Sequence, residues 1–130
     1  MVGILLVTHN SLGDSFVDCI EHVLGEVPQN LKVLSVYASD DPQKKLLEGQ
    51  ELIKQLDAGA GVLILADIFG ATPSNIARQL CHAERVMGVA GVSLPMLLRV
   101  VCYPATTLPE LAKVAIDGGR DSIVHINPDK

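Results

Sequence analysis

The sequence has no tryptophan, two phenylalanines and two tyrosines, so few side chains could sandwich a flat cofactor ring. Its three cysteines, Cys19, Cys81 and Cys102, are widely spaced without a CxxC pair, which argues against a disulfide framework and a thiolate zinc site. We expect them to be reduced, buried, small hydrophobic residues. Lysine and arginine form no cluster and the formal net charge is −5, which argues against a nucleic-acid partner.

Long hydrophobic runs are also missing. The first apolar run meets polar residues at Thr8 and has no basic region before it, and the longest later run, residues 61–66, has the length of a strand. Neither is typical of a signal peptide or a membrane span, so we expect a cytoplasmic protein without membrane insertion. The 130 residues, 48% of them hydrophobic and mostly aliphatic, predict one domain over residues 1–130 with strands buried between helices.

Hydrophobic periodicity predicts strands that alternate with helices. Asp41 before Pro42 and Thr107 before Glu110 are N-cap signals. The expected strands are residues 2–7, 31–37, 61–66, 85–90 and 122–126, and the expected helices are residues 12–24, 42–56, 73–82, 94–102 and 108–116. Such alternation indicates an α/β three-layer sandwich with a flavodoxin-like, mostly parallel sheet, in the order 2-1-3-4 plus a C-terminal strand. In this order the carboxyl ends of strands 1 and 3 open a crevice.

A histidine and an aspartate follow those two strands. His9 comes at the end of the first strand and Asp67 at the end of the third. A neutral imidazole is a nucleophile only through the nitrogen that lacks a proton. A carboxylate that accepts the Nδ1 proton would fix the tautomer and leave Nε2 free. We therefore predict that Asp67 orients His9 as a phosphoryl acceptor, in a reaction that requires neither metal nor cofactor.

The turn after Asp67 is a candidate phosphate-binding segment. Gly70, Ala71 and Thr72 lead into a helix N-terminus, where free N–H groups and the helix dipole favour an anion. Thr72 is either the N-cap of that helix or a phosphate donor, and both roles can hold at once. The turn lacks the GxxxxGK[ST] pattern of a nucleotide cradle, so we infer a single phosphoryl group rather than bound ATP.

Three blocks of the sequence resemble the IIA component of the mannose-family phosphoenolpyruvate-dependent sugar phosphotransferase system. They are GILLVTHN at 3–10, LILADIFGATPSNIA at 63–77 and GVSLPMLLRV at 91–100. The resemblance implies a phosphotransferase component in which His9 is phosphorylated, Asp67 is its hydrogen-bonding partner and Thr72 lies near the phosphoryl group. It also implies the phosphocarrier HPr as donor, a IIB component or a regulatory protein as acceptor, and a homodimer whose C-terminal strands, residues 122–126, are exchanged.

The chain departs from the family pattern at several positions. Asn10 replaces the usual glycine after the histidine, Ala71 the second glycine of the turn, Ser74 a bulkier residue and Ser93 a common asparagine. Asn10 tolerates a positive φ better than most residues, so we expect the turn to survive. The chain ends at Lys130 without the linker and IIB domain of some relatives, and we expect a IIA protein whose acceptor is another polypeptide.

Three alternatives remain open at this point. Receiver-like modules share the fold and are phosphorylated where Asp67 lies, but they need an acidic pair after strand 1 and residues 8–10 offer none. A flavin or nucleotide binder is weakly supported because aromatic residues are few. The phosphocarrier subunit of dihydroxyacetone kinase is close to the main interpretation, although the FGATP and LPML blocks favour the mannose type. We interpret His22 and His82 as helix-surface residues and His125 as a strand residue.

Overall fold

A computed structural model describes residues 1–129 of the chain. Within them strands and helices alternate as the hydrophobic periodicity predicts. The strands are β1 (Gly3–His9), β2 (Leu31–Val36), β3 (Val62–Ala66) and β4 (Val86–Ala90), and the helices are α1 (Leu12–Leu24), α2 (Pro42–Leu56), α3 (Thr72–Leu80), α4 (Leu94–Cys102) and α5 (Leu108–Asp121).

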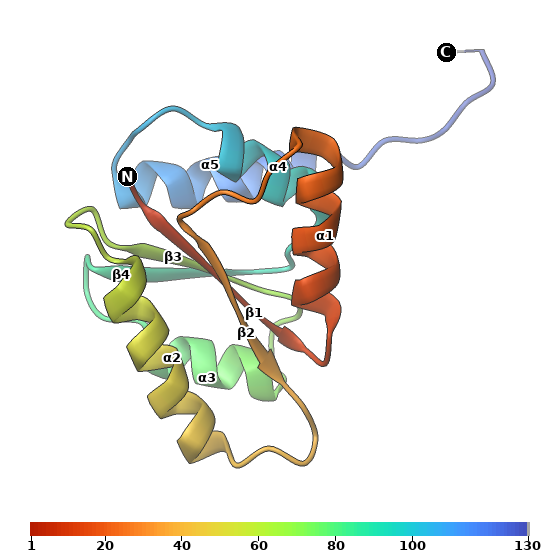
Figure 1. Cartoon of the computed structure of the whole chain (residues 1–130). Helices are drawn as coiled ribbons and strands as arrows, with labels where there is room; N and C mark the ends of the chain where they lie inside the picture. Colours follow the sequence, from red (N-terminus) through yellow and green to blue (C-terminus); the bar gives the residue numbers. More distant parts are fainter. Residues whose placement is uncertain (130) are drawn as a thin grey trace.

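The strands form one parallel sheet in the order β2-β1-β3-β4, which confirms the predicted fold class and order. Helices α2 and α3 cover one face, and α1, α4 and α5 cover the other, giving three layers (Figure 1). In the register, Leu6 of β1 lies opposite Val33 on one side and Leu65 on the other. The carboxyl ends of β1 and β3 therefore lie side by side at one end of the sheet.

The central strands β1 and β3 supply both hydrophobic cores. Leu6 and Leu65 pack toward α1, α4 and α5, whereas Val7 and Ile64 pack toward α2 and α3. All four side chains are fully buried. Strands covered on both faces need continuous apolar sequence, which explains why polar residues with chemical function appear only where these strands end.

Helix α5 is longer than the sequence predicts. It continues to Asp121 through Gly118 and Gly119, whereas the predicted helix ends at Ile116. A Cβ atom on Gly118 would lie 3.0 Å from Arg99 Cδ, and one on Gly119 would lie 2.8 Å from Met96 Cε. The two glycines therefore allow α5 to pack closely on α4, and this close packing outweighs their weak helix propensity.

The single chain forms no C-terminal strand within the described residues, so the strand predicted for residues 122–126, which the resemblance assigns to a partner's sheet, stays a prediction. Residues 123–127 form no strand and lead away from the sheet (Figure 1). A strand exists only when another strand completes its hydrogen bonds, and here this tail meets none among residues 1–129. No helix in the same range is both long and apolar enough to cross a membrane.

The prediction that the cysteines are buried is also wrong. Cys19, Cys81 and Cys102 are all exposed. Cys81 follows the last residue of α3 and Cys102 is the last residue of α4, where helix ends leave the core. Cys19 precedes the fully buried Ile20 in α1. Successive residues of a helix point about 100° apart, so Cys19 points away from the core that Ile20 enters.

Candidate active site

Neighbouring strand ends bring His9 and Asp67 into contact. His9 is the last residue of β1, and Asp67 directly follows β3. The Oδ2 atom of Asp67 lies 2.8 Å from His9 Nδ1 and accepts the backbone N–H of His9 at 2.9 Å. Its Oδ1 atom accepts the N–H of Ile68 at 3.0 Å. Both oxygens of the carboxylate are therefore engaged, and one of them binds the ring and the backbone of His9 together.

This contact determines which ring nitrogen is free. Because a carboxylate can only accept a hydrogen bond, the proton of a neutral imidazole must lie on Nδ1, which leaves the lone pair on Nε2. The His9 side chain is 46% exposed, whereas that of Asp67 is 9% exposed. The arrangement gives an accessible nucleophilic nitrogen backed by a nearly buried carboxylate.

The same contacts determine the charge state of Asp67. Burial raises the pKa of Asp67, but the backbone N–H and the ring of His9 and the N–H of Ile68 outweigh it. The pKa of Asp67 therefore lies below its ordinary value. At neutral pH the side chain is a carboxylate that can stabilise positive charge on the imidazole.

The turn between β1 and α1 is held by the backbone and by Thr8. Asn10 has a φ of 49°, as its predicted tolerance of this conformation allows, and its N–H donates to the carbonyl of Val36 at 2.9 Å. The fully buried Thr8 accepts the N–H of Gly13 through Oγ1 at 2.8 Å and so caps the first turn of α1. Sequence reasoning missed Thr8, although a hydroxyl at the end of an otherwise apolar strand was a signal.

Ser74 closes the turn between β3 and α3. Its Oγ atom accepts the N–H groups of Gly70 and Ala71 at 2.8 and 3.1 Å, and its hydroxyl donates to the carbonyl of Ala71 at 2.9 Å. Ser74 is 8% exposed. Ser74 is the third residue of α3, and its side chain reaches back to the backbone N–H of the N-cap residue and of the residue before it, as in one half of a capping box. Sequence reasoning listed Ser74 only as a departure from the family.

The boundary of α3 differs from the predicted one. Ala71 is the N-cap, in extended conformation, and Thr72 is the first residue of the helix, so the interpretation of Thr72 as N-cap is wrong. Pro73 is the second residue rather than the first. The helix ends at Leu80 and not at His82, because the backbone at Cys81 turns to an extended conformation.

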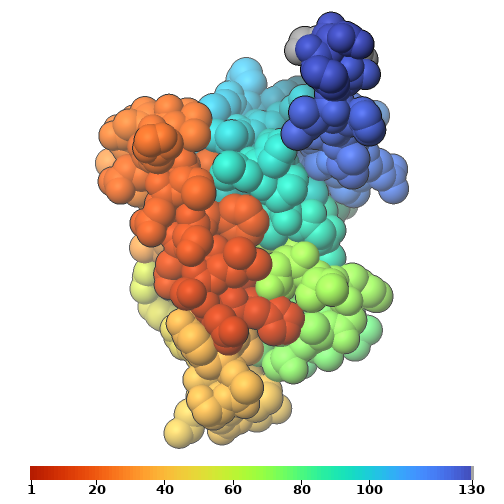
Figure 2. Space-filling model, turned by 90° about the vertical axis from the view of Figure 1, so that its right-hand side faces the viewer, coloured from red at the N-terminus to blue at the C-terminus, as the bar shows by residue number. Residues whose placement is uncertain are grey.

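A hollow of about 360 Å³ lies beside His9. It is bordered by Asn10 from the first turn, by Tyr37 and Asp40 from the segment after β2, and by Thr72 at the start of α3. Figure 2 looks onto this end of the sheet, where the start of α1 (red), the segment into α2 (gold) and the start of α3 (green) meet. Two apolar side chains of the β3–α3 turn stand out to solvent nearby, Ile68 at 56% and Phe69 at 79% exposure.

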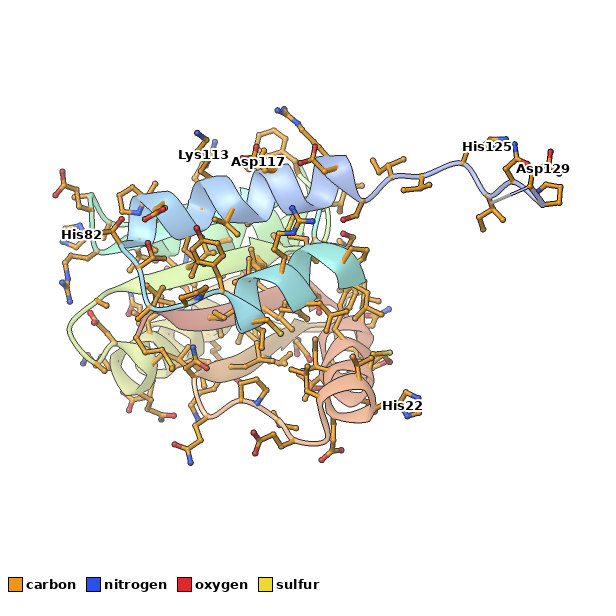
Figure 3. All side chains as sticks on the ribbon, turned by 90° about the horizontal axis from the view of Figure 1, so that it is seen from above. His22, His82, Lys113, Asp117, His125 and Asp129 are labelled. Atoms are coloured by element: carbon orange, nitrogen blue, oxygen red, sulfur yellow. The ribbon has the colours of Figure 1, made fainter. Side chains whose placement is uncertain are left out.

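The other three histidines come from separate parts of the chain and point outward (Figure 3). His22 lies in the last turn of α1, as expected. His82 lies beyond the end of α3, where it forms an isolated bridge with Val86, and His125 lies in the C-terminal tail rather than in a strand.

Comparison with known proteins identifies the family of the chain. A family model for the EIIA-man family, described as "PTS system fructose IIA component", matches residues 3–114. The sorbose-specific EIIA component of the phosphotransferase system (PTS) of Lacticaseibacillus casei is 31% identical over 102 residues, covering 75% of this chain and 70% of that protein. The mannose-specific EIIAB component of Escherichia coli is 26% identical over 125 residues, covering 94% of this chain. The chain spans only 38% of that longer protein.

Solved structures show the same fold. The mannose/sorbose-specific IIA subunit from Enterococcus faecalis superposes with a TM-score of 0.85 at 24% identity, covering 97% of this chain and 95% of that one. The EIIA component from Streptococcus agalactiae gives a TM-score of 0.85 at 20% identity, covering 96% and 97%. Together with the family match over most of the chain, these likenesses lead to one conclusion: the chain belongs to the EIIA-man family of PTS IIA components.

Proposed function

We propose that the protein relays a phosphoryl group through His9 Nε2. HPr is the donor, and the acceptor is a IIB component for sugar uptake or a regulatory protein. The observation that carries this proposal is the 2.8 Å contact between His9 Nδ1 and Asp67, which leaves Nε2 unprotonated on a half-exposed ring. The membership in a family of phosphotransferase components supports the same reaction.

Transfer proceeds as an in-line displacement between two imidazoles. The lone pair of His9 Nε2 forms a bond to phosphorus while the N–P bond of the donor's phosphohistidine breaks, and that electron pair returns to the donor's ring. The His9 ring keeps its Nδ1 proton and becomes positively charged, which the carboxylate of Asp67 stabilises. Because the protein performs little covalent work beyond this, positioning and electrostatics supply most of the rate.

The start of α3 is the proposed phosphate-binding segment. Thr72 borders the hollow beside His9, so its hydroxyl can donate to a phosphoryl oxygen. Gly70 and Ala71 shape the turn, and their N–H groups become donors to a phosphoryl group only when Ser74 Oγ releases them. Thr72 is therefore the direct contact in this proposal, and the turn positions it.

A protein donor requires an open apolar surface, and the surroundings of His9 offer one. Ile68 and Phe69 directly follow Asp67, and both are more than half exposed. A few side chains buried at the centre of a protein interface, many of them aromatic, contribute most of the free energy of association. We infer that these two side chains contact the docked donor or acceptor.

We also propose a homodimer in which the tails are exchanged. Within residues 1–129, β4 has no strand on its outer side, and a groove of about 560 Å³ runs beside it. The tail carries Ile123, Val124 and Ile126, which are 84%, 70% and 94% exposed. A tail from a second copy would pair with β4 and bury these side chains.

The decisive test is labelling from phosphoenolpyruvate with enzyme I and HPr. Wild-type protein should become labelled, and the label should survive alkali and be lost in acid, as expected for phosphohistidine. His9→Gln should remove all labelling, whereas His22→Gln, a matched change on the surface of α1, should leave it intact. Full labelling of the His9→Gln protein would refute the assignment.

Phosphorylation on Asp67, as in a receiver-like module, is the second candidate. Both oxygens of Asp67 already accept hydrogen bonds, and its side chain is 9% exposed, which makes the carboxylate a poor nucleophile. An acyl phosphate is destroyed by alkali, so the same labelling experiment separates the two candidates. Transfer of label to a IIB component, and not to a dihydroxyacetone kinase subunit, separates the remaining alternative.

A further inference from the structure

A phosphoryl group on His9 Nε2 would bring about two negative charges into the hollow. The hollow already contains one carboxylate, Asp40, and His9 rests on a second, Asp67. Among residues 1–129, no lysine or arginine lines this hollow, and the nearby Lys45, whose Nζ lies 3.7 Å from Asp40 Oδ2, already pairs with that carboxylate. Neutral hydrogen-bond donors must therefore hold the phosphoryl oxygens in the absence of a partner protein.

Most donors at this end of the sheet are already used. The N–H groups of Gly70 and Ala71 donate to Ser74 Oγ, and the N–H of Tyr37 donates to Asp40 Oδ2 at 2.7 Å. The backbone N–H groups of His9 and Asn10 are also engaged. The side-chain donors that line the hollow are then the amide of Asn10 and the hydroxyls of Tyr37 and Thr72.

Asn10 is the best placed of these donors because it follows His9 directly. Its backbone is fixed by the 2.9 Å bond to Val36 and by a φ of 49°. Glycine would satisfy that φ without strain. Asparagine satisfies it as well and adds a side-chain amide with two N–H donors, which is exposed and forms no hydrogen bond within the described residues.

We propose that the side-chain amide of Asn10 binds a phosphoryl oxygen on phosphorylated His9, opposite the hydroxyl of Thr72. This inference rests on the proposed relay and adds a contact that a glycine cannot make. A neutral donor beside the new bond stabilises the phosphorylated state without changing the charge of the free protein. The chain therefore holds its phosphoryl group more tightly than it would with glycine at position 10.

The experiment measures the phosphoryl-transfer equilibrium between HPr and three proteins: wild type, Asn10→Gly and Asn10→Asp. The Gly variant keeps the backbone conformation and lacks the donor, so its equilibrium constant for phosphorylation should fall about tenfold. The Asp variant has a similar shape but adds a charge, so its constant should fall further, by about a hundredfold. Phosphoramidate, a small donor, should give the same ranking of phosphorylation rates, because it makes no protein contact that the substitutions could disturb.

A direct signature comes from NMR spectroscopy of the wild-type protein. The side-chain amide signals of Asn10 should shift on phosphorylation, and the phosphorus signal of the phosphohistidine should differ between wild type and Asn10→Gly. Thermal unfolding of the unphosphorylated variants shows whether the fold is kept. If wild type is never labelled, the relay itself fails. If wild type is labelled while Asn10→Gly has an unchanged equilibrium and the Asn10 amide signals do not move, the proposed contact is wrong.

Discussion

Two adjacent strands of the sheet have opposite characters. Every residue of β3 is buried, and Asp67, which directly follows the strand, has both of its oxygens hydrogen-bonded. The edge strand β4 has only two buried residues, Val86 and Val89, and borders an open groove. A strand packed on both faces fixes the direction of the group at its end, whereas an edge strand leaves hydrogen bonds available to another chain. The end of β3 therefore positions the reacting groups, whereas β4 is available for association with another chain.

Among changes near the end of β3, replacement of Asp67 should have the largest effect on phosphoryl transfer. Asp67→Asn keeps the shape of the side chain but removes the charge that fixes the Nδ1 proton of His9. We expect the rate of labelling from phosphorylated HPr to fall about a hundredfold, the size of a typical acid–base contribution. Size-exclusion chromatography should show an unchanged oligomeric state. An unchanged labelling rate would mean that the contact with His9 is only structural.

The same variant should change how stability depends on pH. The pKa of Asp67 in the folded protein lies below its ordinary value, so the stability it contributes is present above about pH 4. That contribution is lost as the pH falls through the depressed value in the folded protein. Unfolding curves of wild type and Asp67→Asn should therefore differ at neutral pH and converge in acid. Curves that stay parallel down to low pH would contradict the assigned cause.

Removal of the Ser74 hydroxyl, in the turn that follows β3, should have a smaller effect on phosphoryl transfer. Ser74→Ala leaves the N–H groups of Gly70 and Ala71 without their acceptor, which should cost about 1–3 kcal/mol of stability. Labelling should slow only severalfold, because His9 and Asp67 keep their contacts. Ser74→Thr retains a hydroxyl and should recover most of the rate. Equal labelling rates for the Ala variant and wild type would show that the turn does not position Thr72.

Deletion of residues 123–130 should have the smallest effect on phosphoryl transfer and should change only the association of two copies at β4. The free energy of unfolding of the single chain should barely change, because most of the described residues of the tail, 123–129, are exposed. Light scattering should show a dimer for the full chain and a monomer for the shortened one. Ile126→Ser in the full chain provides a milder version of the same test. A shortened chain that still dimerises would contradict the exchange of tails.

The sequence predicted the sheet order and the meeting of His9 with Asp67, because both depend on local patterns. Continuous apolar runs mark strands buried on both faces, and the alternation with helices leaves few topologies. In a parallel sheet the ends of neighbouring strands lie at the same edge, so two polar residues far apart in sequence were expected there. These parts of the fold follow from periodicity, from chain direction and from the strand order that short doubly wound sheets commonly adopt.

Other features could not be predicted because they depend on packing between distant segments. The continuation of α5 through Gly118 and Gly119 follows from contact with α4, which the local propensity of glycine does not reveal. The sequence suggested that the N–H groups of Gly70 and Ala71 bind phosphate, but in the structure both donate to Ser74 Oγ. The sequence alone does not reveal this acceptor. The tail forms no strand in the single chain, because strand formation depends on a partner strand as well as on the residues of the tail.

The common direction of the four strands has a practical consequence. Met1 precedes β1 and His9 ends it, and seven extended residues span roughly 20 Å, so the amino terminus lies at the far end of the sheet from the reactive ring. A purification tag or a surface linker attached at Met1 would leave the face around His9 unobstructed. Immobilised in that way, the protein could capture a passing donor or acceptor in its natural orientation.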